Sequence, residues 1–329
     1  MLNRFKNIKL HKKTVILALL LVLVLLLLFF AVRLLVLSNK ISFESVDEEV
    51  PEIDPAYAAG QGIVFPSIEP VYRDDIVNIL FLGTDFQLSE EERGRCDSNM
   101  LCSLNTRTGD IKLVSFERGI GVPVPGRGSD LLTHAYHWGG SALSQSIISS
   151  MFSVDVKGYV QVDFDSFAAI ISVLGGVDVE LTEVEAQALN GAIPTQVWAW
   201  AEVHEGWNHL GGHDTLQYCR LRSIDSDWNR QRRQRTVLEQ VQKKCRGMSP
   251  TKLLNLAEEI LPMIHTNLSK DEVTRLILKL PVLLRGEVTQ LQVPDKNGFE
   301  GTIRCIPDYE AKKIANFLYD TDYELITPY

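Results

Sequence analysis

The amino-acid sequence predicts an α/β protein in which a single transmembrane helix precedes a mixed β-sheet domain with helices on both faces. Three observations lead to this prediction. Residues 14–38 form an apolar run that follows a basic N-terminus. Farther along the chain, short apolar segments typical of buried strands alternate with longer segments of helical periodicity. Because strands and helices interleave, we expect the helices to cover both faces of one sheet.

The N-terminal segment predicts an uncleaved membrane anchor. Residues 1–13 contain Arg4 and four lysines but no acidic residue. The next stretch holds about 20 apolar residues before Arg33, enough to cross a hydrocarbon core of roughly 30 Å. Its basic flank predicts a cytoplasmic tail (1–13), an anchor in the cell membrane (14–38) and an extracytoplasmic remainder. A cleaved signal peptide is the alternative, but its apolar region is typically ~7–15 residues long and ends at a small-x-small site.

The remainder of the chain is predicted to consist of a stalk and a domain. Residues 39–73 are acidic and contain four prolines, which disfavour regular elements. Residues 74–329 are long enough for one large globular domain or two small ones, and we expect a single domain. Every Asp and Glu follows Lys40 and the net charge of the chain is −9, so the external part is acidic. This charge argues against nucleic acid as a partner.

The five cysteines predict no metal site. No CxxC pair and no Cys/His spacing typical of zinc is present. They are Cys96, Cys102, Cys219, Cys245 and Cys305. An odd number leaves at least one thiol unpaired, and a Cys245–Cys305 disulfide is one option outside the cytoplasm. The sequence settles neither the disulfide pairing nor the oligomeric state.

Apolar periodicity and capping residues place the elements of the domain. The predicted strands are 77–82, 100–104, 111–116, 159–164, 177–181 and 288–293. Proline and glycine predict an extended loop at 123–128. The predicted helices follow Gly139-Gly140, Asp165, Asp227 or Asn229, Ser249-Pro250, the capping box Ser269/Glu272, and Asp308.

Two carboxylates lie at predicted strand ends. Asp85 follows the strand 77–82, and Asp97 precedes the strand 100–104. Carboxylates at strand ends can converge on a divalent cation, and Mg²⁺ typically takes one or two of them together with water and substrate phosphate. Taken alone, the two residues are better explained as a turn residue and a strand flank.

Arginines concentrate in a second stretch. In an extended chain Arg220 and Arg222 would point the same way. On the helix that follows, Arg230, Arg233 and Gln234 are expected to share a face that continues into valines. Guanidinium groups bind phosphate oxygens in bidentate geometry, so a phosphate-bearing ligand is indicated. The alternative is a solvated basic helix with surface ion pairs.

These residues lie in segments that, in order and spacing, resemble the LytR-CpsA-Psr family of cell-wall ligases. The resemblance extends from the anchor to at least Lys244. The segments are Asn78–Asp85, Arg95–Leu101, Phe116–Pro123, His134–Gly140, Leu174–Val177, Leu210–Gly212, Tyr218–Arg222 and Asp227–Gln234. The resemblance implies the family fold, with a polyprenyl chain held in an apolar tunnel between the sheet and its helices.

The resemblance also implies roles for individual residues. Asp85 and Asp97 are similar to the family's carboxylates for Mg²⁺ (or Mn²⁺), and Asp97, Asp85 and Arg118 to its catalytic residues. The implied pyrophosphate-binding residues are Arg95, Arg118, Arg220, Arg222, Arg230 and Gln234. The candidates for the lipid-binding wall are Val162, Phe164, Phe167, Ile170, Ile171, Leu174, Val237 and Val241.

Two positions depart from the family pattern. Glu117-Arg118-Gly119 stands where the family usually has Pro-Arg-Asp, and Leu131 stands where it commonly has Lys. The missing carboxylate at Gly119 leaves the general base open, with Asp97 as first candidate and Asp85 as second.

The implied activity is a phosphotransferase reaction that attaches a glycopolymer from a polyprenyl-pyrophosphate carrier to peptidoglycan. The acceptor would be a hydroxyl of N-acetylmuramic acid, and polyprenyl phosphate would leave. The sequence does not identify the polymer, with teichoic acid and capsular polysaccharide as the family's examples. Alternatives are a non-catalytic receptor for the lipid pyrophosphate, an envelope regulator, and a lipid pyrophosphatase.

Overall fold

The computed structural model of the protein describes residues 42–43, 51–85, 93–195, 197, 201–294 and 305–326. The predicted cytoplasmic tail and anchor lie outside these residues. Within the described ranges, no helix has both the length and the apolar character needed to cross a membrane.

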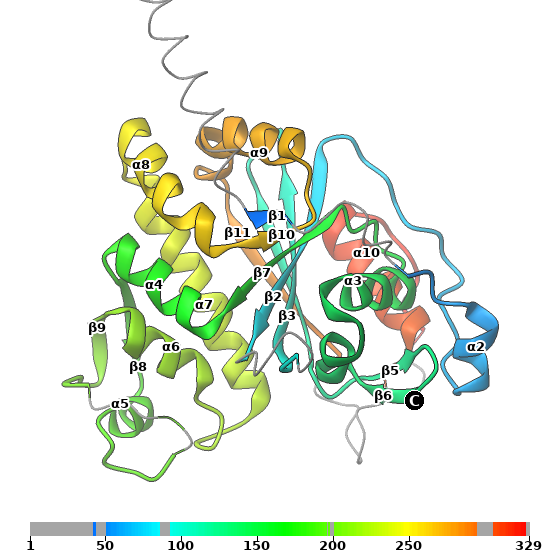
Figure 1. Cartoon of the computed structure of the whole chain (residues 1–329), viewed down its shortest axis with the longest axis horizontal. Coiled ribbons are helices and arrows are strands. Elements are labelled where there is room, and N and C mark those ends of the chain that lie inside the picture. The colour runs from blue at the N-terminus through cyan, green and yellow to red at the C-terminus, as the bar shows by residue number, and fades with distance from the viewer. Residues whose placement is uncertain are drawn as a thin grey trace, which may run out of the picture.

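A seven-stranded mixed sheet forms the centre of the described molecule (Figure 1). Its spatial order is β1-β10-β7-β2-β3-β4-β11. The bounds are β1 (Ser42–Phe43), β2 (Ile76–Thr84), β3 (Cys96–Asn105), β4 (Ile111–Phe116), β7 (Gly158–Asp163), β10 (His265–Thr266) and β11 (Val288–Val293). β2, β3 and β4 are antiparallel neighbours, whereas β7 and β11 run parallel to β2 and β4. Two hairpins lie outside the sheet: β5 (Gly121–Val124) with β6 (Gly128–Leu131), and β8 (Val177–Leu181) with β9 (Gly206–Leu210).

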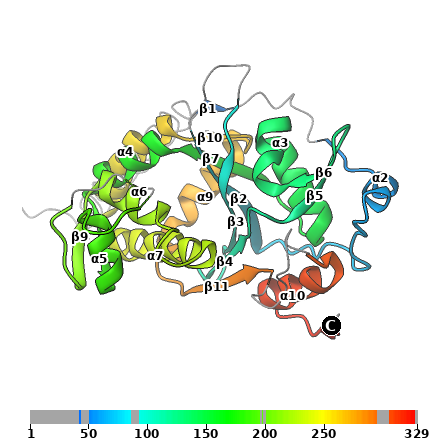
Figure 2. The same cartoon turned by 90° about the horizontal axis from the view of Figure 1, so that it is seen from below.

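Helices cover both faces of this sheet, as predicted (Figure 2). The first group is α2 (Pro55–Gly60), α3 (Leu132–Phe152) and α10 (Pro307–Tyr319), of which α3 and α10 pack on one face. The second group is α4 (Phe164–Leu174), α5 (Glu183–Leu189), α6 (Gly212–Arg220), α7 (Asp227–Arg246), α8 (Pro250–Ile260), the 3₁₀ turn η1 (Leu261–Met263) and α9 (Lys270–Leu283). In this second group α7 and α9 pack on the opposite face of the sheet.

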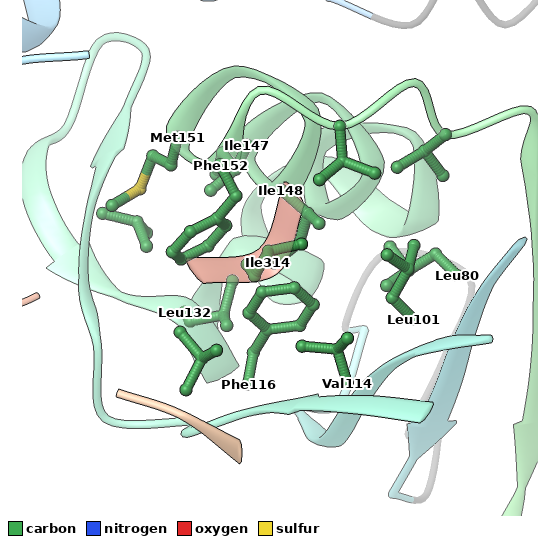
Figure 3. Close-up of a cluster of buried hydrophobic side chains, with 14 of the residues drawn as sticks. Leu80, Leu101, Val114, Phe116, Leu132, Ile147, Ile148, Met151, Phe152 and Ile314 are labelled. Atoms are coloured by element: carbon green, nitrogen blue, oxygen red, sulfur yellow. The ribbon is translucent and has the colours of Figure 1, made fainter. Parts of the chain in front are cut away.

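The main hydrophobic core lies between the sheet and α3 (Figure 3). Leu80, Leu101 and Val114 come from three neighbouring strands, and Ile147 and Ile148 come from the helix. The rings of Phe116 and Phe152 meet in this core with their centroids 4.7 Å apart. A second core joins α4, α6 and α7 to the β8–β9 hairpin. The two cores lie on either side of the central strands. Residues at the strand ends that lie between the two cores are therefore held from both sides.

Several predicted elements have the predicted bounds, because apolar and β-branched residues recur along them between turn residues. β4, β8 and β11 match residue for residue, and β7 is displaced by one residue. Ser249 caps α8, and Ser269 and Glu272 form the capping box of α9.

Other predicted elements differ from the structure. The segment 123–128, predicted as a loop, contributes to the β5–β6 hairpin. α3 begins before Gly139-Gly140 and is kinked there, since Gly140 has a φ of 65°. Asp163 caps α4 in place of Asp165, and Ser226 caps α7 in place of Asp227 or Asn229. Asp308 accepts hydrogen bonds from Ser67 and does not cap α10.

The described part of the expected stalk, residues 51–73, packs against the domain and does not stand apart from it. Ile53 and Ala58 are fully buried, and Phe65 and Ile68 pack on the main core. Prolines did not prevent a helix, because Pro55 occupies the first turn of α2, where its missing N–H has no helical partner to lose.

All five cysteines are free thiols, so the Cys245–Cys305 disulfide is not formed. Burial raises the pKa of Cys102 and of Cys219 to about 12. These two thiols are therefore unreactive packing residues at neutral pH.

Replacing Phe152 with Ala should lower the free energy of unfolding by about 3–5 kcal/mol, because it empties the core beside Phe116. Urea denaturation followed by circular dichroism measures this loss. Val64→Ala is the control: its side chain is 70% exposed and the change should cost less than about 0.5 kcal/mol. Equal stability of the two variants would contradict the assigned core.

Candidate functional site: an apolar cavity with arginines and a carboxylate at one end

A cavity of about 460 Å³ lies between the sheet and the second group of helices. Its wall is mostly apolar and comes from β2, β3, β7, α4, α6, α7 and the α8–η1 segment. One end holds the polar residues Asp97, Arg220, Arg222, Arg230 and Gln234. Apolar walls with convergent charges at one end suit a long apolar ligand with an anionic headgroup.

A β-bulge turns Asp97 toward this cavity. Gly83 pairs with Ser98 and Thr84 pairs with Cys96, so Asp97 has no partner residue on β2. Because of the extra residue, Cys96 enters the main core while Asp97 and Ser98 both line the cavity. Bulges commonly re-aim side chains in this way beside functional sites.

Two arginines and two carboxylates form an ion-pair network around Asp97. Arg118 donates from Nη1 to Asp97 Oδ1 at 2.7 Å, and Arg230 Nη1 lies 3.5 Å from Asp97 Oδ2. On their other sides both arginines face Asp227, with Arg230 Nη2 at 3.0 Å and Arg118 Nε at 3.5 Å. The charges therefore alternate in sign around the network.

Buried protein groups make most of the contacts that hold the network in place. Only 3% of Arg230 is exposed, and its guanidinium also donates to the main-chain oxygen of Asp97 at 2.9 Å. Burial opposes ionisation of Asp97, but Arg230 and Arg118 outweigh it and keep the pKa of Asp97 below its usual value. Asp97 is therefore a carboxylate at neutral pH and fixes both guanidinium groups.

Glu117 lies behind this network. Its carboxyl accepts from Gln231 Nε2 at 2.6 Å, and its backbone N–H donates to Val293 of β11. Burial and the adjacent Asp227 carboxylate raise the pKa of Glu117 to about 8. At neutral pH it is thus mostly protonated and can donate a hydrogen bond to Asp227.

Arg220 and Arg222 reach the cavity by a different route from the one predicted. Arg220 is the last residue of α6, so the chain is not extended through it, and Arg222 follows the helix end. Both side chains nevertheless line the cavity. The Arg220 guanidinium lies 4.7 Å from the centroid of the Phe164 ring, which positions it at the junction of polar and apolar walls.

Arg233 does not share the ligand-facing side of α7 with Arg230 and Gln234. It is fully buried, donates to Glu185 at 2.7 Å and to the main-chain oxygen of Leu221 at 2.7 Å, and pairs with Asp225. This arginine therefore ties α7 to α5 and to the segment after α6. Gln234, one residue later, donates to Cys219 O at 3.4 Å and accepts from Ser98 Oγ at 3.0 Å beside the cavity.

Asp85, which follows the end of β2, pairs with Arg95, which precedes the start of β3. Asp85 N donates to Arg95 O at 3.0 Å, and Arg95 N donates to the Asp85 carboxylate. Neither residue lines the cavity, and the Arg95 side chain is exposed. Asp85 and Arg95 therefore continue the pairing of β2 with β3 past Thr84 and Cys96, but they do not share the cavity wall with Asp97.

Six of the eight residues predicted for the lipid-binding wall line the cavity. These are Val162, Phe164, Phe167, Ile170, Ile171 and Val241. Leu174 and Val237 instead belong to the second core and are almost fully buried there. Ile260 and Ile264 extend the wall at its apolar end, and nothing in the local sequence separates them from other core residues.

The sequence also gave little indication of three residues behind the arginines. Asp227 is predicted only as a helix cap, although its position three residues before Arg230 on a helix also predicts an ion pair between the two side chains. Glu117 and Gln231 lie far apart in the chain, so no local pattern connects them. Within the described residues no group of three or more His, Cys, Asp or Glu side chains could form a metal cage.

Comparison with known proteins identifies relatives of this chain. Teichoic acid transferases named TagU (polyisoprenyl-teichoic acid–peptidoglycan teichoic acid transferase) match with 32% identity over 212 residues in Bacillus anthracis and 33% over 208 in Bacillus mycoides. The first match covers 62% of this chain and 64% of that protein, and the second 61% and 64%. The matched part of this chain therefore spans a little under two thirds of the relatives' length.

Solved structures show the same fold. A structure described as TagT bound to LIIa-WTA superposes with a TM-score of 0.60 at 24% identity, covering 84% of this chain and 99% of that one. Another, TagT with bound octaprenyl pyrophosphate lipid, gives a TM-score of 0.55 at 21% identity, covering 83% and 95%.

The family model described as LytR_cpsA_psr matches residues 45–320, which include every strand and helix named above except the edge strand β1. The match spans most of the chain, and the chain therefore belongs to the LytR-CpsA-Psr family.

Proposed function

We propose that this chain is a phosphotransferase that moves a glycopolymer from a polyprenyl-pyrophosphate carrier to a hydroxyl of peptidoglycan. One observation carries the proposal: an apolar cavity ends at a fixed network of arginines around a buried carboxylate. The TagU relatives are named for this transfer, and the fold is that of a TagT structure that holds octaprenyl pyrophosphate. The polyprenyl chain would lie along the apolar wall, with the pyrophosphate at the arginines.

The reaction follows from this placement. The acceptor oxygen attacks the phosphorus that carries the sugar, the bond from that phosphorus to the bridging oxygen breaks, and polyprenyl phosphate leaves. Arg118, Arg220, Arg222 and Arg230 stabilise the charge on the transferring and departing phosphates, the main catalytic effect in such reactions. Because the network positions Arg118 and Arg230 in advance, little reorganisation is needed when the charge develops.

The acceptor proton is assigned to Asp97. Its oxygens lie beside Arg118 and Arg230, so it is next to the bound phosphate. Its lowered pKa makes it a weak base, which suffices for a loose transition state that needs little prior deprotonation of the nucleophile. Glu117 is protonated and turned toward Asp227, so it does not replace the carboxylate absent at Gly119 as a base.

We propose that Mg²⁺, or Mn²⁺, would be held at the cavity by Asp97, with Asp85, which lies off the cavity wall, as the second carboxylate. The donor set fits a cation that arrives with the pyrophosphate better than one held by protein alone, since Asp97 already faces two guanidinium groups. Magnesium commonly binds through one or two carboxylates and substrate phosphate oxygens. When bound, it would neutralise charge on the phosphates.

The location is part of the proposal. Residues 14–38 would anchor the chain in the cell membrane and keep the domain on its outer side. A lipid-linked donor presents its headgroup at that surface, within reach of the cavity.

The direct test uses the full-length protein in detergent with Mg²⁺, a polyprenyl-pyrophosphate sugar and uncrosslinked peptidoglycan. We expect a covalent sugar–phosphate–muramic acid product and one polyprenyl phosphate per transfer, measured by mass spectrometry. Free sugar phosphate would identify a pyrophosphatase. Intact lipid retained by the protein, with no product, would identify a receptor and refute the transfer.

Arg220→Ala should lower kcat by about 10²–10³, because it removes a charge from the transferring phosphate. The matched control is Arg285→Ala, whose exposed side chain lies after α9 and away from the cavity. Transfer rates of both variants at saturating donor provide the comparison. Normal turnover by Arg220→Ala would remove Arg220 from the site.

Glu117→Gln should weaken the pH dependence of stability. The pKa of Glu117 in the folded protein is about 8, above its ordinary value of 4.5. Its contribution to the free energy of unfolding is therefore fully present below about pH 4.5 and is lost as pH rises through 8. Gln keeps a neutral side chain, so the variant's loss of unfolding free energy from pH 5 to pH 9 should be smaller than that of the unmodified protein by on the order of 4 kcal/mol. Urea denaturation of both proteins at the two pH values measures it. Parallel losses would show that Glu117 is ionised in the folded protein.

A further inference from the structure

A cluster of exposed polar and aromatic side chains lies at the start of α3. It consists of Arg127, Asp130, His134 and Trp138, which we call the α3 rim cluster. Asp130 accepts from Trp138 Nε1 at 2.7 Å and lies 2.7 Å from His134 Nδ1. The Arg127 guanidinium stacks over the Trp138 ring, 3.8 Å from its centroid. Each of the four side chains is thus held by another member.

The four side chains are accessible to solvent, although their mutual contacts hold them in one arrangement. Trp138 is 37% exposed and Arg127 is exposed, while Asp130 and His134 are about a quarter exposed. The His137 ring meets the Trp138 ring at 73° and helps to hold it. Exposed side chains locked in one arrangement lose little conformational entropy when they bind a ligand.

The rim cluster includes residues of α3, the helix that contacts the ion-pair network on the side of Asp97 away from the cavity. Thr133 in the first turn of α3 donates to Asp97 at 3.5 Å and, through its N–H, to Arg118 O at 3.0 Å. Trp138 follows five residues later, a rise of about 7.5 Å along the helix. Asp97 therefore lies between the cavity and α3. Figure 2 shows α3, β5 and β6 on the opposite side of the central strands from α4 and α6.

This placement matters for the direction of attack. In phosphoryl transfer the attacking and leaving oxygens lie roughly in line through the phosphorus. Under the proposed function, the leaving polyprenyl phosphate lies in the cavity. The acceptor hydroxyl must then approach from the α3 side of Asp97 and Arg118, where the rim cluster is exposed.

We propose that the α3 rim cluster binds the acceptor, a sugar unit of an uncrosslinked glycan strand, and delivers its hydroxyl to the phosphate. This inference rests on the proposed function. The indole and guanidinium planes offer a flat surface for the C–H face of a sugar ring, and the carboxylate of Asp130 can accept from hydroxyl or amide groups. Arg127 supplies a positive charge for a carboxylate of the acceptor's peptide stem.

The first experiment measures binding without any transfer. Full-length protein in detergent is titrated with soluble uncrosslinked glycan strands, and separately with polyprenyl pyrophosphate. Trp138→Ala should weaken glycan binding at least tenfold and leave lipid binding unchanged. Trp207→Ala is the matched control, because Trp207 is 59% exposed on β9 and belongs to neither site. Trp138→Phe, which keeps an aromatic face, should restore most of the affinity.

The second experiment separates acceptor from donor in turnover. Trp138→Ala should raise the acceptor KM at least tenfold with the donor KM unchanged, a pattern that a general loss of structure would not produce. Glycan binding by Trp138→Ala equal to that of the unmodified protein, or no glycan binding by the unmodified protein, overturns the acceptor site. Glycan binding that depends on Trp138 without any transfer would support the acceptor site while refuting the proposed function.

Discussion

The alternating ion pairs of Asp97, Arg118, Asp227 and Arg230 are the constraint on which the rest of the site depends. A buried guanidinium is costly unless carboxylates and hydrogen bonds compensate for lost water. Arg230 is compensated by Asp97 and Asp227 together, so the start of β3 and the start of α7 must stay together. The cavity lies between these same elements. Its polar end is therefore fixed by the electrostatics that stabilise the fold, with Arg118 and Arg220–Arg222 arranged around it.

The sequence predicted the sheet better than it predicted the surroundings of the charges. Strands such as β4 and β11 are short runs rich in apolar and β-branched residues that lie between segments with Gly or Pro, a pattern that leaves few alternatives to a strand. Helical periodicity placed Arg233 near the face of Arg230, but Glu185 on another helix draws it into a buried pair. Likewise Leu174 and Val237 have the same apolar character as Ile171 and Val241. Only the packing of α4 and α7 around α6 and the β8–β9 hairpin decides which of them face the cavity.

Glu117 and Gly119 illustrate why a departure from a family pattern is hard to interpret from the sequence alone. The missing carboxylate at Gly119 leaves the general base open, and no local pattern indicates a role for Glu117, two residues earlier. In the structure Glu117 is the residue that contacts Asp227 and Gln231. A protonated Glu117 leaves Asp227 as the ionised partner of both arginines. The local count of negative charges is thus set by a hydrogen bond between carboxyl groups, which no linear pattern reveals.

The pairing of Asp97 with Arg230 also has a consequence for how the protein is made. The two residues are 133 positions apart in the chain, and the cavity wall is complete only when Ile264 has been added. Contacts of such long range form late, because the loop between them must close first. A growing or truncated chain could thus have the β2–β3–β4 strands without a complete cavity. Under the proposed function, only a chain that extends past Ile264 would bind the lipid-linked substrate.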